Sequence, residues 1–424
     1  MIYEFAINHY IQIKKKKKKN TKKIKKKEKK YKGKKYIFLY LCIKKERKMI
    51  NKKISILLFL ILLFSYSCID NPSTPVDPDF ISGKQGALIL CEGLFGSDNS
   101  SITCISFADN SYTNNYFRNA NDGQKLGDIA NDIYIKDSLV YVAVSNSKTI
   151  EVFHLKTGKS IGRIKLPNYV MPRRFAFVND TLAYVTTYIS MSNDDFYVYE
   201  FNPKTITLTG VKIYVGSHPE GIDYYNNKLY VVNSGYGEYH SYHTKASTIS
   251  IIDINSKTEI QCIPTGANPA RIIASPKTNK LYVLYWGLYS EESPAGIIEY
   301  DLNTLQELRR WTTEAYEFCL NSSCDTLFYL NSSASTDYIN EDNDFGVNYI
   351  PLNAANTAPV KYIKNPKQNE IWTGIALNET RNEIWIANSY RYTTNGDVTV
   401  YDRTTLAVKQ TYKVGSIPTL IKFY

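Results

Sequence analysis

Apolar residues along this chain recur in short runs that begin with Leu or Ile and are followed by a polar loop. Six runs share this form: Leu139–Ala143, Leu182–Thr186, Leu229–Asn233, Leu281–Tyr285, Leu327–Asn331 and Ile384–Asn388. Their starting positions lie 43, 47, 52, 46 and 57 residues apart. A period of roughly 40 to 50 residues with only strand-like pieces is typical of a β-propeller, in which each repeat forms one four-stranded blade.

The repeat from Pro219 to Gly266 contains all four expected strands. They cover Pro219–Tyr224, Lys228–Asn233, Thr248–Asn255 and Glu259–Pro264. The turn Asn226-Asn227 joins the first two strands as a hairpin. Alternating polar residues in the outer strands indicate one wetted face, whereas the nearly continuous apolar inner strands indicate burial between neighbouring blades.

A proline opens four of the repeats, three residues before an Ile or Phe. These openings are Pro172–Phe175, Pro219–Ile222, Pro269–Ile272 and Pro418–Ile421, and two further openings near Glu317 and Thr373 lack the proline. Because proline fixes φ and cannot donate to a central ladder, we interpret these prolines as markers of blade borders.

Two incomplete repeats remain at the ends of the repeat region. Gly415–Tyr424 reads as a first strand with nothing after it, whereas Gly86–Arg118 contains strand-like runs without a first strand. Those runs are Ala87–Cys91, Ser101–Phe107 and Asn115–Arg118. We therefore predict an all-β, seven-bladed β-propeller over residues 86–424. Its ring is closed by Thr419–Tyr424 pairing into the N-terminal blade, which removes an exposed sheet edge.

The formal net charge of +12 is concentrated ahead of the repeats. Residues 1–48 contain 20 Lys or Arg and 3 Glu, and without them and Lys52-Lys53 the charge of residues 68–424 is −7. A basic arm for nucleic acid has no evident role ahead of an export signal. We therefore expect residues 1–48 to be translated upstream sequence, with Met49 as the true start.

Residues 49–67 have the pattern of a secretory signal peptide, in which Lys52-Lys53 precedes the apolar run Ile54–Phe64. This run is shorter than the roughly 20 residues that a membrane-spanning helix needs. It ends near Cys68 and resembles a bacterial lipoprotein signal with Cys68 as the lipidated residue, although Ser65 stands where such signals prefer Leu. An ordinary signal peptide is the alternative. The proline-rich residues 68–85 are expected to form a lipidated tether.

Five cysteines follow Cys68, so at least one of them stays unpaired. Cys91–Cys104 and Cys319–Cys324 each fall on adjacent strands of an expected hairpin. In an oxidising compartment either pair is a candidate disulfide, and the sequence leaves both open.

The spare length of the repeats lies in the connections between second and third strands, which share one face of a propeller. We call this the long-loop face, and its connections are residues 188–195, 234–246, 286–295, 332–344 and 389–396. Loops on a rigid scaffold are where binding residues concentrate. These loops combine Tyr and Trp with Ser, Gly and Asn, as binding paratopes do. Solvated loops without a ligand are the alternative.

We predict ten ligand-binding residues on this face. They are Tyr236, Tyr239, His240, Tyr242, Trp286, Tyr289, Tyr338 and Tyr390, with His218 and Glu220 at a blade crossing. The same loops are rich in Asp and Glu, which disfavours nucleic acid and other polyanions as partners.

Catalytic motifs are lacking in the sequence, which contains no H-E-x-x-H, G-x-S-x-G, Walker A or G-x-G-x-x-G pattern. We therefore predict a protein without catalytic residues, metal or cofactor. Whether calcium binds near Asp342–Asp344 is left open, because the loop lacks the full ligand spacing of a calcium loop.

The repeat phrases Leu229–Ser234 and Val215–Ile222 resemble those of the YVTN/YncE-like β-propeller family. Three N-terminal stretches, Glu92–Gly96 with Ser101–Thr103, Leu126–Ile133 and Asn146–Val152, are similar to surface lipoproteins that include the cobalamin-capturing BtuG type. The resemblance implies a lipid-anchored propeller at the outer membrane or cell surface of a Gram-negative bacterium. It also implies a partner, a TonB-dependent outer-membrane transporter that receives the captured ligand.

These expectations combine into one functional prediction and two alternatives. We predict a non-enzymatic binding protein that captures a small-molecule nutrient for such a transporter, with a corrinoid as the specific candidate. One alternative is an adhesion or protein-interaction propeller. The other is a propeller lactonase or lyase with a metal at the mouth of the channel.

Overall fold

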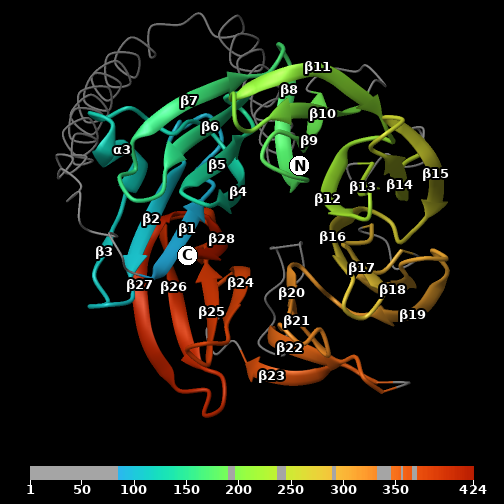
Figure 1. The fold of residues 1–424 in the computed structure, drawn as a ribbon. Coiled ribbons are helices and arrows are strands. Elements are labelled where there is room, and N and C mark those ends of the chain that lie inside the picture. The colour runs from blue at the N-terminus through green and yellow to red at the C-terminus, as the bar shows by residue number, and fades with distance from the viewer. Residues whose placement is uncertain are drawn as a thin grey trace, which may run out of the picture. The chain divides into compact units, whose positions relative to one another are not determined.

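The computed structural model describes residues 85–189, 196–235, 245–288, 293–331, 345–354, 357–364 and 370–424. These residues form seven four-stranded antiparallel sheets, arranged as blades around a central channel (Figure 1). The predicted all-β, seven-bladed propeller is therefore confirmed. The predicted extension (1–48), signal peptide (49–67), lipidated Cys68 and most of the tether lie outside the described residues.

The strands of each blade are given from the channel outward. Blade 1 consists of β28 (Pro418–Phe423), β1 (Gly86–Cys91), β2 (Ser101–Ser106) and β3 (Tyr112–Thr113). Blade 2 consists of β4 (Ala130–Lys136), β5 (Leu139–Val144), β6 (Thr149–His154) and β7 (Ser160–Lys165). Blade 3 consists of β8 (Val170–Phe177), β9 (Ala183–Ile189), β10 (Tyr197–Asn202) and β11 (Thr207–Tyr214). Blade 4 consists of β12 (Pro219–Tyr225), β13 (Lys228–Asn233), β14 (Thr248–Asp253) and β15 (Thr258–Pro264).

The remaining blades follow the same order. Blade 5 consists of β16 (Pro269–Ser275), β17 (Lys280–Tyr285), β18 (Gly296–Asp301) and β19 (Glu307–Thr312). Blade 6 consists of β20 (Phe318–Leu320), β21 (Thr326–Asn331), β22 (Gly346–Pro351) and β23 (Val360–Lys364). Blade 7 consists of β24 (Trp372–Asn378), β25 (Glu383–Asn388), β26 (Asn395–Asp402) and β27 (Val408–Ser416).

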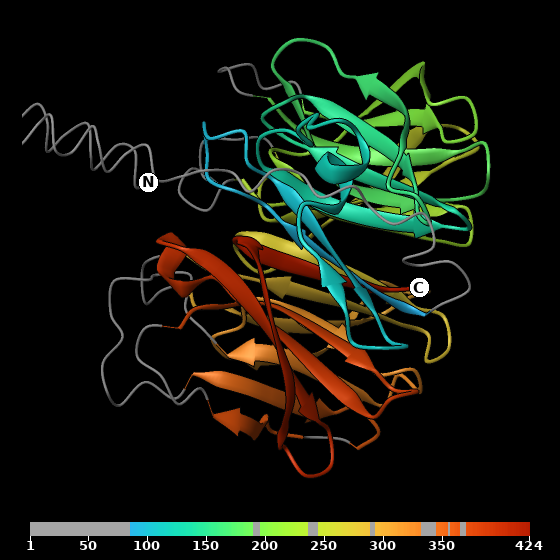
Figure 2. The same ribbon diagram turned by 90° about the vertical axis from the view of Figure 1, so that its left-hand side faces the viewer.

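The C-terminal strand closes the ring as predicted. β28 pairs antiparallel with β1, with Ile89 opposite Ile421 and Ala87 opposite Phe423 (Figure 2). It supplies the inner strand of a blade whose other strands come from the beginning of the propeller. The Tyr424 hydroxyl adds a hydrogen bond of 3.1 Å to the Ile105 carbonyl.

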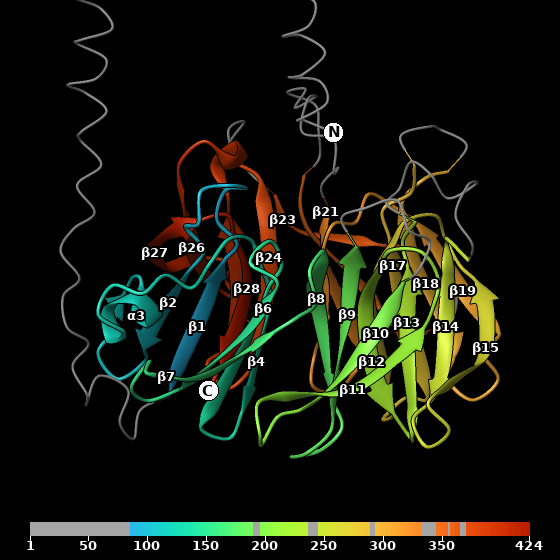
Figure 3. The same cartoon turned by 90° about the horizontal axis from the view of Figure 1, so that it is seen from above.

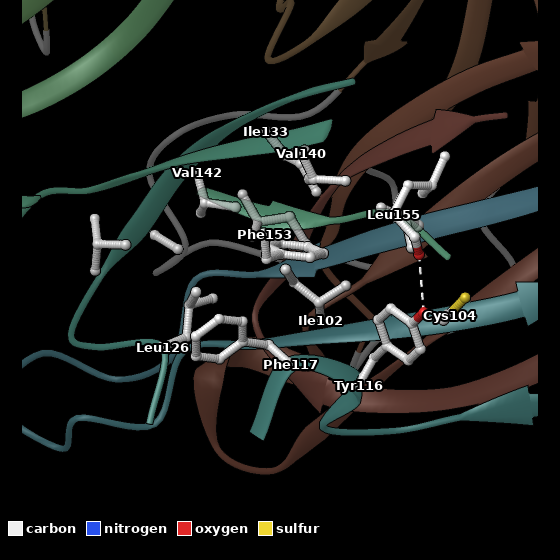
Figure 4. Close-up of a cluster of buried hydrophobic side chains, with 14 residues drawn as sticks. Ile102, Cys104, Tyr116, Phe117, Leu126, Ile133, Val140, Val142, Phe153 and Leu155 are labelled. Carbon is white, nitrogen blue, oxygen red and sulfur yellow. Dashed lines mark hydrogen bonds between the residues drawn. The ribbon is translucent and has the colours of Figure 1, made fainter. Parts of the chain in front are cut away.

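The predicted strand Asn115–Arg118 is wrong, because this segment forms the short helix α3 (Tyr116–Ala120). Its apolar residues Tyr116, Phe117 and Ala120 are buried. Tyr116 and Phe117 pack against residues of blade 2, and the Tyr116 hydroxyl donates to the Leu155 carbonyl at 2.8 Å (Figure 4). Helical spacing brings these side chains to one side, and the outer strand β3 is consequently only two residues long.

Apolar side chains between neighbouring blades form seven separate buried clusters. Each cluster includes the residue at the Ile or Phe position of one inner strand: Ile133, Phe175, Ile222, Ile272, Phe318, Ile375 and Ile421. Every one of these residues is at most 8 % exposed. Each blade is thus stabilised by the surface it buries against its two neighbours, so the closed ring is the unit of stability.

The five described cysteines are all free, so neither candidate disulfide forms. Cys91 is paired across the hairpin with Ser101, whereas Cys104 lies opposite Leu88, which sets the two thiols three positions apart. Cys319 faces Phe328, and Cys324 lies in the following turn. Burial raises the pKa of the Cys91 and Cys104 thiols to about 12. Within the described ranges, no helix is long and apolar enough to cross a membrane.

Candidate functional site

The inner strands all start at the long-loop face of the propeller, where the channel opens. In the edge-on view the short turn η1 (Tyr390–Tyr392) lies at this end and the C-terminus at the other (Figure 3). We call the long-loop end of the channel the mouth. The residues that begin the inner strands and those that follow the second strands therefore surround the mouth.

One position of the repeat recurs at the mouth in five blades. It is the residue after the second strand, whose backbone N–H donates to the carbonyl of the residue just before the inner strand. Blades 2, 4 and 7 have a serine there, whereas blades 1 and 5 have Glu92 and Trp286. The serine hydroxyls are used by the scaffold, as in the hydrogen bond of 2.8 Å from Ser234 to the His218 carbonyl.

Buried charges line the mouth on one side. Arg173 forms two hydrogen bonds to the Glu220 carboxylate, at 2.9 and 3.0 Å, and Arg271 binds Glu317 at 2.7 Å. Arg271 also lies 3.6 Å from Glu220, so one carboxylate joins two arginines. These four side chains come from the four consecutive blades 3 to 6 and are at most 19 % exposed.

A third arginine extends this network toward blade 2. The Arg174 guanidinium lies 3.8 Å from the Asp132 carboxylate and 3.6 Å from Glu220. The second oxygen of Asp132 accepts the backbone N–H of Phe175 at 2.9 Å. The network therefore contains three guanidinium groups and three carboxylates, which balance one another.

The pKa values of Glu220 and Glu92 are shifted in opposite directions. Burial by itself would raise the pKa of Glu220, but Arg173, Arg174 and Arg271 outweigh it and hold that pKa at about 2. Burial also raises the pKa of Glu92, and here the same three arginines, which form no direct ion pair with its carboxyl, do not outweigh it. Glu220 is thus a fixed anion, and Glu92 is a carboxyl that its surroundings leave less strongly ionised.

Aromatic rings form the rest of the mouth. Trp286 stacks on Tyr316 with ring centroids 5.6 Å apart and planes at 13°, and its Nε1 donates to the Tyr316 carbonyl at 3.0 Å. Tyr392 lies beside Tyr316 and Glu92, and its pKa is raised by burial and then by the charge of Glu92, which outweigh the lowering effect of Tyr316. On the other side, the Arg173 guanidinium lies 4.5 Å from the centre of the Tyr188 ring.

The turn that carries Tyr392 has a strained backbone. Tyr390, Arg391 and Tyr392 have φ values of 43, 55 and 61°, in the left-handed region that non-glycine residues avoid. Such conformations cost of order 1–3 kcal/mol each and cluster at functional sites. The turn directs Tyr390 away from the mouth, where its hydroxyl donates to Asp397 and the Lys413 ammonium lies 5.5 Å from its ring.

Behind the network the channel contains a cavity of about 650 Å³. All seven inner strands line it, with Asp132, Arg174, Arg271 and Glu317 at its mouth end. Asp223, Glu379 and Lys422 line its other part, and burial raises the pKa of Asp223 to about 6. This volume lies within the range of about 300–1,000 Å³ that is usual for small-molecule sites.

Four of the predicted ligand residues can be located in the structure. Trp286, Glu220 and His218 lie at the mouth; the His218 ring contacts Tyr188 edge-on at 5.2 Å, and its Nδ1 lies 2.8 Å from the Ser217 hydroxyl. Tyr390 does not join them. The other six predicted ligand residues, Tyr236, Tyr239, His240, Tyr242, Tyr289 and Tyr338, and the loop Asp342–Asp344 lie outside the described residues.

Sequence reasoning missed most of the charged network. Its residues occupy the two positions before the Ile or Phe of the inner strands in blades 2 to 6, as in Pro172-Arg173-Arg174-Phe175. Charged residues inside a strand that is otherwise apolar were the available signal. Glu92 was missed because it belongs to the incomplete first repeat. In the described part of the chain, no three His, Cys, Asp or Glu side chains are grouped as metal ligands.

Residues 85–417 match the family model described as "Domain of unknown function (DUF5074)". No curated protein matches the chain. Among solved structures, the chain is similar to a periplasmic gluconolactonase of Pseudomonas aeruginosa, with TM-score 0.57, 13% identity and coverage of 80% of this chain and 99% of that one. It is also similar to a putative 6-phosphogluconolactonase of Bacteroides uniformis, with TM-score 0.54, 12% identity and coverage of 80% and 100%. A third similar structure comes from Lactobacillus plantarum, with TM-score 0.57, 14% identity and coverage of 80% and 99%. At these identities the likenesses show the fold alone.

Proposed function

Since the chain belongs to the DUF5074 family, which is defined by a domain of unknown function, we propose a function from the geometry of the mouth. The protein is a non-enzymatic binding propeller that takes a small organic nutrient at the mouth of its channel. A lipid on Cys68 anchors it at the surface of a Gram-negative outer membrane, and a TonB-dependent transporter receives the ligand. A corrinoid is the first candidate ligand, on the resemblance to the BtuG type.

The observation that carries this proposal is the pairing of flat aromatic rings with fixed charges at one end of the channel. Trp286 and Tyr316 present a stacked pair, and the ion pairs of Arg173 and Arg271 hold the strands beneath it. Rings of this kind usually supply most of the energy of a binding site, at about 2 kcal/mol or more each on truncation. The charges orient a ligand and discriminate among ligands more than they add affinity.

The enzyme alternative is supported by two structural neighbours, a gluconolactonase and a putative 6-phosphogluconolactonase. At 12 and 13% identity these neighbours do not transfer an activity. The surface-adhesion alternative is supported by no described feature. We therefore place both alternatives among the outcomes of the test.

The test is a binding screen on the full chain by isothermal titration calorimetry, with cyanocobalamin and a panel of sugars, amines, nucleosides and organic acids. We expect at least one member to bind, and Trp286→Ala to weaken it about thirtyfold or more, since a lost aromatic anchor costs about 2 kcal/mol. Tyr214→Ala is the matched control, because Tyr214 is 40% exposed on the outer strand β11.

Two outcomes would replace the proposal. If no member of the panel binds, the nutrient-binding function is wrong and an adhesive role takes its place. If δ-gluconolactone is hydrolysed and hydrolysis requires a stoichiometric metal, the protein is an enzyme. The anchoring part is tested separately, because Cys68→Ala should move the protein from the membrane fraction to the soluble fraction without changing its affinity.

A further inference from the structure

Glu92 stands at a position of the repeat that the scaffold fills with serine. Ser145, Ser234 and Ser389 occupy it in blades 2, 4 and 7, and each hydroxyl is hydrogen-bonded within the propeller. Glu92 keeps the shared backbone hydrogen bond, from its N–H to the Ile417 carbonyl at 2.8 Å. Its side chain is therefore not required for the geometry of the crossing.

The carboxyl group of Glu92 has no hydrogen bond or ion pair within the described part of the chain. The charged groups of the network are paired: Arg173 with Glu220, Arg271 with Glu317, and Arg174 with Asp132. With Glu92 added, these side chains amount to four carboxylates and three guanidinium groups. The half-buried Glu92 is the one among them without an ion pair.

Aromatic rings lie near this carboxyl together with the arginines, and the Arg271 guanidinium lies 5.8 Å from the centre of the Trp286 ring. Tyr316 and Tyr392 both lie within electrostatic range of Glu92, and Trp286 stacks on Tyr316. The negative faces of such rings attract a cation, and Trp is the strongest of them. An anionic ligand would meet an additional carboxylate here, and its burial beside that carboxylate would be unfavourable.

We propose that Glu92 is the polar anchor of the mouth and that the ligand presents a positively charged nitrogen to it. The cation supplies the fourth positive charge of the site and lies against the rings of Trp286, Tyr316 and Tyr392. An organic ammonium compound meets this description, because its charge is spread over a surface that the rings can contact. A corrinoid would offer neutral amides, which engage Glu92 by hydrogen bonds alone.

This inference rests on the proposed function and narrows its ligand class. The probes are three small molecules of similar shape and different charge: benzyltrimethylammonium, benzyl alcohol and phenylacetate. Their affinities for the full-length protein are measured by NMR titration. We expect the cation to bind about tenfold more tightly than the alcohol and the anion to bind most weakly.

The variant Glu92→Gln removes the charge and keeps the shape. It should reduce the affinity for benzyltrimethylammonium to about that for benzyl alcohol, whose own affinity should not change. Glu92→Ser is the companion variant, because serine is the residue that blades 2, 4 and 7 hold at this position, so it is compatible with the fold. A melting temperature equal to that of the wild type confirms folding of both.

The outcomes separate this inference from the function on which it rests. If all three probes bind equally and Trp286→Ala abolishes them, the mouth is a ligand site and the role of Glu92 is refuted. Tighter binding of phenylacetate, or unchanged cation binding in Glu92→Gln and Glu92→Ser, also refutes it. If none of the probes binds and the larger panel is negative too, both proposals fall.

Discussion

Blades 3 to 6 and blades 7 and 1 build the same channel wall from the same backbone but with different side chains. Both groups place an Ile or Phe in the buried clusters, as at Ile222 and Ile421. The two preceding positions differ. Blades 3 to 6 have charged residues there, whereas blades 7 and 1 have Thr373 with Gly374 and Thr419 with Leu420.

The difference shows that an inner strand of this propeller can form without charged residues at these two positions. In blade 7, the Thr373 hydroxyl donates to the Pro418 carbonyl at 2.6 Å. Gly374 allows the close approach of blade 1, because a Cβ at this position would overlap the Thr419 carbonyl oxygen. Buried ion pairs are seldom more stable than apolar residues of the same volume. The charges of blades 3 to 6 are therefore not needed to build this backbone, as the ligand-binding role proposed above would require.

The largest effect is expected from removing the inner strand of blade 1, which belongs to the uncharged part of the channel wall formed by blades 7 and 1. Deletion of Gly415–Tyr424 removes β28 and exposes Ala87, Leu88 and Ile89, which are 0% exposed in the intact protein. We expect the loss of soluble, folded protein, because an open blade presents an unpaired edge and an uncovered core. Soluble yield and circular dichroism measure this. Removal of ten residues at the other end, Met1–Tyr10, is the control, and an unchanged melting temperature of the β28 deletion would disprove closure.

The next largest effect is on the free energy of unfolding, and it compares one residue of the charged blades 3 to 6 with one residue of the uncharged blades 7 and 1. Glu220→Gln leaves Arg173 buried without its ion partner, so we expect the free energy of unfolding to fall by about 3 kcal/mol. Thr419→Val is the matched change in blade 1, where the Thr419 hydroxyl is buried without a hydrogen bond. It should be neutral or stabilising by about 1 kcal/mol. Denaturant unfolding measures both, and equal effects would contradict the distinction between the two sides.

The charged side should also give the protein its sensitivity to acid. The pKa of Glu220 is about 2 in the folded protein and 4.5 in its ordinary state, so it contributes stability above pH 4.5 that is lost as the pH falls toward 2. The contribution is at most about 3 kcal/mol. Burial raises the pKa of Asp223 to about 6, which acts with the opposite sign and is common to wild type and variant.

The measurement is the free energy of unfolding of wild type and Glu220→Gln between pH 6 and pH 3. The difference between the two proteins should shrink as the pH falls, because protonation of Glu220 makes the wild type resemble the variant. A difference that stays constant over this range would show that the arginines do not lower the pKa of Glu220.

The sequence was sufficient for the blades because their signal is repeated. Each apolar run from Leu139–Ala143 to Ile384–Asn388 was matched by a second strand in the structure. The error at Asn115–Arg118 arose in the incomplete repeat, where no second copy was available for comparison. There Tyr116, Phe117 and Ala120 also satisfy a helical pattern, and Gly158 allows that helix to approach blade 2 closely.

The site was less predictable, because it depends on which of several similar residues faces the channel. The long-loop face was inferred from loop length, but length does not distinguish the inner end of a loop from its outer end. The three arginines and Glu220 lie in inner strands, at the variable positions of the Pro-x-x-Ile pattern, whereas the prediction used only its fixed positions. The orientation of Tyr390 and Tyr392 depends on three consecutive residues with left-handed backbone conformation, which no sequence pattern predicts.

The smallest expected effect tests whether Tyr392, but not Tyr390, belongs to the ligand site. Tyr392→Phe removes a hydroxyl that lies beside Tyr316 and Glu92, whereas Tyr390→Phe removes one that is bound to Asp397 outside the mouth. The Tyr392 hydroxyl interacts with Tyr316, and the loss of one hydrogen bond costs about 1 kcal/mol, so Tyr392→Phe should loosen this pair of rings and weaken the binding of benzyltrimethylammonium about threefold to fivefold. Tyr390→Phe should leave it unchanged and lower only the melting temperature, because Asp397 then keeps Lys413 as its remaining partner. If Tyr390→Phe changes the affinity as much as Tyr392→Phe does, the ligand extends beyond the mouth to blade 7, and the site must be redrawn around η1.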